Sequence, residues 1–297
     1  MTRKEMLKDL LEQAKKVELP IEEMKYLFIG MGNPDSKILI VGKEASIGDK
    51  KNVNDMAQIE RDKKQIEREI NNNILQWDYV IDKQWDIVID KQWSKIPNFA
   101  VYENGTDNYS PLYPYKGHIN TITNENKKKP KIILNGGTSR TWFNYQKLRD
   151  EIFKKEEKSP NINFHEDYFF TELNQIPSRY SGQQKTKVRK EIIAIRSKTI
   201  FESEFIQSFP VVILACGPSY ISEQDICKLF DVKAFGQRKG VDYGERKQWY
   251  DTYQNVHGNS PKMVVHTWQL GMCIADEYLR MVGKDIADFC AENNIEL

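Results

Sequence analysis

Apolar residues recur along this chain at two spacings, and the two spacings alternate from one end to the other. A helical spacing, with apolar positions three or four residues apart, predicts helices over 4–17, 52–76, 141–153, 186–208 and 272–293. Short continuous apolar runs predict buried strands over 37–42, 165–174, 209–217 and 261–267. Strands that alternate with helices pair mostly in parallel and are covered by helices on both faces. We therefore predict an α/β fold in three layers, α/β/α, with a central, mostly parallel four-stranded sheet, formed by residues 1–297 as a single domain.

An eight-residue repeat interrupts this pattern. The segments QWDYVIDK, QWDIVIDK and QWSKI place Trp77, Trp85 and Trp93 at helical positions that drift by about 80° per repeat. Two and a half copies are too few for a solenoid. The repeat indicates a local duplication that lengthens one helix, so we predict a helical insertion at about 50–100; a dedicated aromatic binding ladder is the alternative. The polar segment 103–130 predicts a long loop, and the run KIIL after it is typical of a short strand or a helix start.

Composition and charge narrow the classes of function. The 44 Lys and Arg residues nearly balance the 43 Asp and Glu residues, so a surface that binds nucleic acid has to be a local patch. The four cysteines form no CxxC pair, and Cys216 and Cys290 occupy positions typical of buried thiols, so we expect no cofactor and neither a metal nor an iron–sulfur cluster. The first 16 residues contain acids and lack the apolar core of a signal peptide, and no stretch is long enough to span a membrane. We expect a cytoplasmic monomer.

Ligands of parallel sheets bind beyond the carboxyl ends of the strands, which selects the loops after Val41, Leu173, Ala215 and Val265. The first of these loops contains the carboxylates Glu44 and Asp49, and a carboxylate there can orient water or stabilise a developing cation. A purely structural explanation is that Ser46 or Asp49 caps a helix while Glu44 is solvated.

Asn174 follows the second strand, where a side-chain amide can donate and accept together and so read a pyrimidine edge. The alternative is a turn residue that bonds its own backbone. Gly217 and Pro218 follow the third strand and indicate a tight turn.

His266 ends the last strand, where a neutral histidine can donate to an oxyanion or act as an acid or base; a satisfied core histidine is equally compatible. Trp268 and Leu270 follow it, and they are either core residues or apolar wedges that enter a base stack.

Taken together, these segments resemble the uracil-DNA glycosylase superfamily, whose motifs occur in the same order. KILIVGKEAS is similar to the first motif, with Glu44 and Ala45 at the position of its GEAPG form, and YFFTELN places Asn174 at the asparagine of a TNxVK-like motif. VVILACG is similar to the strand before the last motif, and His266 and Leu270 match the histidine and the leucine of the HPSPLS-like motif. Lys43 is an extra residue, and no Pro-Gly follows Ala45.

The resemblance implies a DNA glycosylase that flips uracil or a modified pyrimidine, such as the glucosylated hydroxymethylcytosine of phage DNA, and hydrolyses its N-glycosidic bond. It implies that Glu44 or Asp49 faces the sugar, that Asn174 reads the base edge, and that His266 stabilises the departing base. Leu270, with Trp268, is the expected wedge. The implied partner is double- or single-stranded DNA, and the implied role is DNA repair or antiviral defence.

A flipped base also needs a ring to stack on and a cationic surface beside it. Tyr109, Tyr113 and Tyr115 in the loop are the candidate rings, although tyrosines in Pro-rich loops are often packing residues. The segment after Asn174 is rich in basic residues, which can contact phosphates or simply form a solvated helix face. They are Arg179, Lys185, Lys187, Arg189, Lys190, Arg196 and Lys198.

Two other functions use the same residues. A nucleoside or nucleotide hydrolase would apply the carboxylate and the histidine to a free small molecule and would need neither a wedge nor a basic flank. A non-catalytic module would bind modified DNA without releasing a base, and it would tolerate Glu44→Gln.

Overall fold

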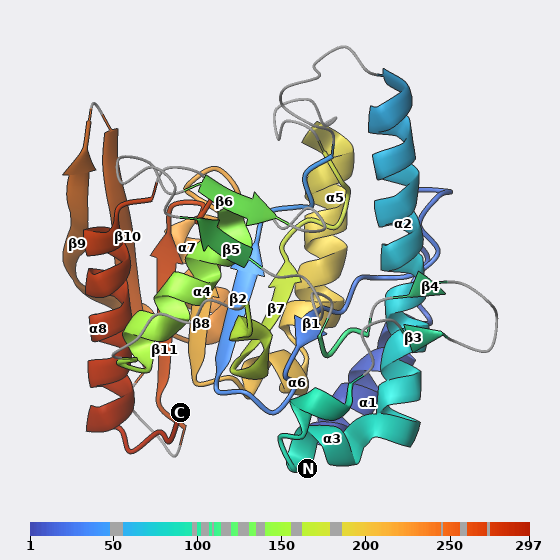
Figure 1. The fold of residues 1–297 in the computed structure, drawn as a ribbon, viewed down its shortest axis with the longest axis horizontal. Coiled ribbons are helices and arrows are strands. Elements are labelled where there is room, and N and C mark those ends of the chain that lie inside the picture. The colour runs from blue at the N-terminus through green and yellow to red at the C-terminus, as the bar shows by residue number, and fades with distance from the viewer. Residues whose placement is uncertain are drawn as a thin grey trace.

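The computed structural model describes residues 1–47, 56–96, 100–101, 107–108, 110–113, 120–123, 131–134, 140–155, 162–178, 186–244, 246–255, 260–271 and 274–297. These residues form a mixed α/β fold built around one large sheet (Figure 1). Asp49, Tyr109, Tyr115, Arg179 and Lys185 lie outside the described residues.

The large sheet has seven strands in the order β1-β7-β2-β8-β11-β10-β9. Their bounds are β1 (Met31–Gly32), β2 (Ile38–Gly42), β7 (Tyr168–Glu172), β8 (Val211–Leu214), β9 (Lys233–Tyr243), β10 (Arg246–Asn255) and β11 (Lys262–Thr267). β7, β2, β8 and β11 are parallel neighbours, whereas β1, β10 and β9 join the sheet antiparallel. The predicted α/β class is therefore confirmed, whereas the sheet has seven strands rather than four and is mixed, because antiparallel edge strands extend the parallel strands on both sides.

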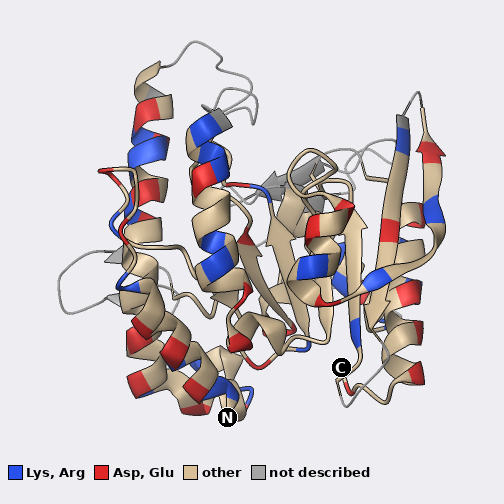
Figure 2. Ribbon diagram, turned by 180° about the vertical axis from the view of Figure 1, so that it is seen from behind, with Lys and Arg blue, Asp and Glu red and all other residues tan. Residues whose placement is uncertain are grey.

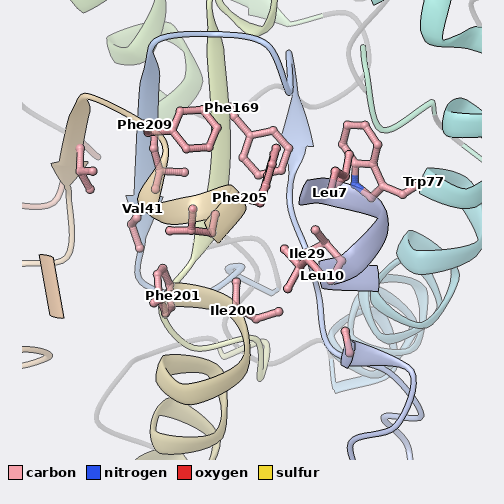
Figure 3. Packing of buried hydrophobic residues seen from close by; sticks show 14 of the residues in the cluster. Leu7, Leu10, Ile29, Val41, Trp77, Phe169, Ile200, Phe201, Phe205 and Phe209 are labelled. Atoms are coloured by element: carbon pink, nitrogen blue, oxygen red, sulfur yellow. The ribbon is translucent and has the colours of Figure 1, made fainter. Parts of the chain in front are cut away.

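The four predicted core strands form where apolar residues run without interruption, since both faces of these strands are buried. One face packs on α1 (Arg3–Ala14), α6 (Glu204–Gln207) and α7 (Glu223–Phe230). Figure 3 shows this cluster, in which Phe169 lies close to Phe205 and Phe209, and Val41 belongs to the same core. The other face packs on α4 (Arg140–Ile152) and α8 (Asp276–Glu292).

The tryptophan repeat belongs to the core. Trp77, Trp85 and Trp93 are all buried, so they do not form an exposed aromatic ladder for binding. They lie on α2 (Met56–Tyr79), α3 (Trp85–Ile89) and the 3₁₀ turn Trp93–Lys95. A π-helical turn, Val80–Gln84, separates α2 from α3. Because such a turn winds more residues per turn than an α-helix, it offsets the drift of the eight-residue period and returns Trp85 to the core.

Other elements differ from the sequence prediction. The helix expected over 186–208 is divided into α5 (Thr186–Arg196), the π-helical turn Ser197–Phe201 and α6. Two small two-stranded sheets border or lie within the segment expected to be a loop: β3 (Ala100–Val101) with β4 (Asp107–Asn108), and β5 (Asn120–Thr123) with β6 (Lys131–Leu134). A 3₁₀ turn, Phe164–Glu166, precedes β7. Among the described helices, none combines the length and apolar character needed to cross a membrane.

Candidate active site at the carboxyl ends of the parallel strands

The four loops selected from the sequence meet at one edge of the sheet. The Asn174 amide donates to the Lys43 carbonyl at 2.8 Å, which joins the loops after β7 and β2. The Gly217 amide donates to the Thr267 carbonyl at 3.1 Å, which joins the segments after β8 and at the end of β11. The side chains that follow these strands therefore converge, as the parallel order predicts.

Two carboxyl groups lie at the ends of the neighbouring strands β2 and β7. Gly42 and Glu172 are register partners, and a Cβ at position 42 would overlap the Glu172 carboxylate in its present position. Glu172 Oε2 is buried and has no hydrogen-bond partner among the described residues. Burial, and secondarily the negative charge of Glu44, raises the Glu172 pKa to about 8, although Arg196 partly opposes the shift. Glu172 is thus mostly protonated at neutral pH.

Glu44 follows β2 and accepts a hydrogen bond from the Tyr220 hydroxyl, which comes from the loop between β8 and α7. The Tyr220 ring lies near two cations: Lys43 Nζ and the Arg189 guanidinium are each 5.3 Å from its centroid. Glu44 and Glu172 are both half-buried as residues, and Oε2 of Glu172 is fully enclosed. The site therefore places a second carboxyl group, Glu44, beside the protonated carboxyl group of Glu172, and paired carboxyl groups can serve acid–base chemistry.

Arg196 supports the end of β7 from within the protein. Its guanidinium is fully buried and donates to the carbonyls of Glu172 and Phe28 and to the side chains of Thr171 and Gln175, at 2.7–3.0 Å. Burial lowers the Arg196 pKa to about 9, and Glu172 opposes that shift. Arg196 is consequently not part of a DNA-facing basic surface, which corrects the reading of it as one of the exposed cations.

His266 lies at the end of β11 and is 4% exposed. Its Nε2 donates to the Gly217 carbonyl at 3.0 Å, and its ring meets the Trp249 ring edge-on at 5.3 Å. Burial lowers the His266 pKa, so the ring is neutral at pH 7, as the sequence-based role required. The Nε2 proton is nevertheless held by a backbone carbonyl, and this conformation does not offer it to a departing base.

Asn174 is fully buried, and its Oδ1 accepts from the Ile176 amide at 3.2 Å. This is the turn geometry of an asparagine that bonds its own backbone two residues on. The structural alternative for Asn174 therefore describes this conformation better than base recognition does.

The two candidate wedge residues, Trp268 and Leu270, differ in their exposure to solvent. Trp268 is 41% exposed, whereas Leu270 is fully buried in the core that α4 and α8 share with the sheet. Leu270 is a core residue here and cannot intercalate without leaving that core, which corrects the prediction.

Tyr113 does not lie at the carboxyl ends of the parallel strands. Its hydroxyl donates to the Ile162 carbonyl at 3.2 Å and its ring stacks on His165, which precedes β7. It therefore belongs near the amino end of β7, opposite the candidate site, and the prediction that it stacks on the base is wrong.

Only part of the basic segment that follows Asn174 lies within the residues that the structure describes. Lys187 is exposed and Arg189 half-buried on α5, and Figure 2 shows several basic positions along this helix with an acidic position among them. Arg189 reaches the site through Tyr220.

Glu172, Tyr220 and Lys43 were missed as site residues. A signal for Glu172 exists in the sequence, because it is a charged residue inside the apolar strand YFFTEL. Cys216, in the third loop, is buried, and burial raises its pKa to about 12, so it is not a thiolate nucleophile. Within the described part of the chain, no group of three or more His, Cys, Asp or Glu side chains could hold a metal ion.

Comparisons of the chain with protein-family models, with curated proteins and with solved structures find no match. Its function has to be inferred from the chemistry of the site.

Proposed function

We propose that this protein is a DNA glycosylase that hydrolyses the N-glycosidic bond of uracil or a modified pyrimidine and leaves an abasic site. The observation that carries the proposal is the carboxyl pair Glu44 and Glu172 at the ends of adjacent parallel strands, in which Glu172 has a buried carboxyl oxygen and a raised pKa. Glycosidic bonds are commonly hydrolysed by two carboxyl groups, one protonated and one ionised.

The chemistry divides between the two groups. The C1′–N bond breaks as water attacks C1′, and positive charge develops on the sugar. The Glu44 carboxylate stabilises that charge and accepts a proton from the attacking water, while Glu172 donates its proton to the departing base. Proton exchange with solvent then restores both groups. Glu172 replaces His266 as the proton donor in this proposal, because His266 Nε2 is engaged with Gly217.

The proposed function also implies a particular architecture for the domain. A glycosylase-like domain would be a three-layer α/β/α unit with four parallel strands at its centre. The consecutive parallel neighbours β7, β2, β8 and β11 support this, as do the two apolar clusters that lie on opposite faces of the sheet.

The test is a panel of duplex and single-stranded oligonucleotides that carry uracil, hydroxymethylcytosine or glucosylated hydroxymethylcytosine. After incubation, alkali converts abasic sites to strand breaks that a denaturing gel resolves. We expect breaks at one modified position, reduced at least about a hundredfold in Glu44→Gln and Glu172→Gln. Glu202→Gln, at an exposed position on the surface, is the matched control and should retain the activity.

Two results contradict the proposal. A folded protein that binds these oligonucleotides but forms no abasic site is a binding module. A protein that neither binds nor cleaves them, and instead releases bases from free nucleosides, is a nucleoside hydrolase.

A further inference from the structure

The proposed hydrolysis leaves one charged residue of the site without a role, Lys43. It stands between Gly42, which pairs with Glu172 of β7, and Glu44. Its carbonyl accepts a hydrogen bond from the Asn174 amide at 2.8 Å, which ties it to the loop after β7. The backbone of Lys43 is therefore fixed beside the two carboxyl groups.

The Lys43 side chain reaches the segment after β8. Its Nζ lies 5.3 Å from the centroid of the Tyr220 ring, whose hydroxyl donates to Glu44. A Cβ at position 217 would lie 4.0 Å from Lys43 Cε, so the lysine stem passes close to Gly217. Burial raises the pKa of the Cys216 thiol to about 12, and the charge of Lys43 opposes that shift. Lys43 thus contacts the loops after β7 and β8 from its own place after β2.

The Lys43 ammonium has no ion-pair partner among the described residues. Lys43 is half-buried, and no described carboxylate lies within salt-bridge distance of its Nζ. The neighbouring Cys216 is buried and protonated, so its thiol does not compete as a nucleophile. A lysine amine in such a position can attack a carbonyl carbon and form an imine, which an arginine guanidinium does not do.

Base release produces a carbonyl group at this site. The abasic deoxyribose opens to an aldehyde at C1′, the atom that the base has left. We propose that Lys43 attacks this aldehyde, so that the protein is also an abasic-site lyase that cuts the strand through an imine. The inference rests on the proposed function for the origin of its substrate, because an abasic site is the product of that reaction.

The cleavage needs no reactant besides water. Once the Lys43 ammonium has lost a proton to solvent, the amine adds to C1′, and loss of water gives the C1′=N bond. Glu44 removes a proton from C2′, the electrons form the C2′=C3′ double bond, and the C3′–O bond breaks as the downstream strand leaves with its 5′-phosphate. Water then hydrolyses the imine, which restores the Lys43 amine and leaves an unsaturated aldehyde on the upstream strand. Glu44 returns its proton to solvent.

The test uses an oligonucleotide whose aldehydic abasic site is prepared chemically, so that no base release by this protein is required. Sodium borohydride reduces an imine to a stable amine and so links the protein covalently to the DNA. We expect a covalent complex on a denaturing gel, with the linkage on Lys43 by peptide mass spectrometry. Parallel samples that receive neither borohydride nor alkali should show strand cleavage. A tetrahydrofuran site, which has no carbonyl group, should give neither product.

Two substitutions separate the amine of Lys43 from its charge. Lys43→Arg keeps the charge and removes the primary amine, so it should lose both the covalent complex and the cleavage while unfolding in urea at the wild-type midpoint. Lys8→Arg, at an exposed position on α1, is the matched control and should retain both. Cleavage retained in Lys43→Arg would show that Lys43 supplies only charge and would overturn the inference.

The inference is also overturned if borohydride traps no complex on the prepared abasic site, or if the linkage lies on another amine of the protein. Failure of the glycosylase is a separate result. Trapping on Lys43 without base release from any modified oligonucleotide would refute the glycosylase and keep the lyase. Base release without trapping, and with strand breaks only after alkali, would do the reverse.

Discussion

Replacing Glu172 by glutamine should change how the stability of the protein depends on pH. The Glu172 pKa is raised from its ordinary 4.5 to about 8, chiefly by burial. The folded state therefore holds this proton more tightly than the unfolded chain does, and ionisation destabilises the fold as pH rises from about 4.5 to 8. Linkage over this interval gives a loss of roughly 3–4 kcal/mol in the free energy of unfolding between pH 5 and pH 8. Glutamine has the same shape and no titration, so the Glu172→Gln variant should lack this loss.

The assay is urea unfolding followed by tryptophan fluorescence at pH 5, 6, 7 and 8. The quantity of interest is the free energy of unfolding of Glu172→Gln minus that of the wild type, which should increase by the same roughly 3–4 kcal/mol from pH 5 to pH 8. Glu202→Gln, at an exposed position, controls for the loss of a carboxylate as such. A difference that stays constant with pH would mean that Glu172 is not held in its protonated form, and the assignment of Glu172 as the acid would then fail.

Three further predictions concern single side chains. Tyr220→Phe removes the hydroxyl that donates to Glu44 and keeps the ring, so kcat for base release should fall roughly ten- to a hundredfold with KM nearly unchanged, measured by steady-state kinetics; an equal rise in KM would contradict a positioning role. The His165 ring is fully buried, its nitrogens have no hydrogen-bond partner among the described residues, and burial holds its pKa well below 6.5. Because the unfolded chain binds this proton more readily, stability should fall as pH drops below about 6.5, and His165→Phe should show a smaller decrease in Tm from pH 7 to pH 5 than the wild type, by calorimetry. Arg196→Met leaves several buried acceptors unpaired and should cost about 3–5 kcal/mol in urea unfolding, whereas a cost below 1 kcal/mol would show that Arg196 does not hold β7 in place.

The core strands could be predicted from the sequence because each is an uninterrupted apolar run buried on both faces. The β9–β10 hairpin could not, since β9 is exposed along most of its length and carries neither an apolar run nor a regular alternation. The sheet consequently has strands beyond the predicted four. The division of the helix expected over 186–208 escaped prediction as well, because apolar residues continue through the π-helical turn Ser197–Phe201 and into α6.

The location of the site could be predicted, but its composition could not. Chain order and strand type place four loops at one edge, which identifies Glu44 and His266 as neighbours of the site. The partnership of Glu44 with Glu172 depends on the register between β2 and β7, two strands far apart in the sequence. Whether a residue near a strand end faces a ligand or the core also depends on tertiary packing, as the contrast between Trp268 and Leu270 shows.

The central claim is that water, positioned by Glu44, replaces a base at C1′. Its most direct measurement is a single-turnover reaction in ¹⁸O-labelled water, with the oligonucleotide that the panel identifies and mass spectrometry of both products. The mechanism predicts release of an unlabelled base from the strand with an abasic sugar left behind, and loss of both products in Glu44→Gln. Label found in a base that remains attached to the strand, or intact oligonucleotide throughout, would contradict it.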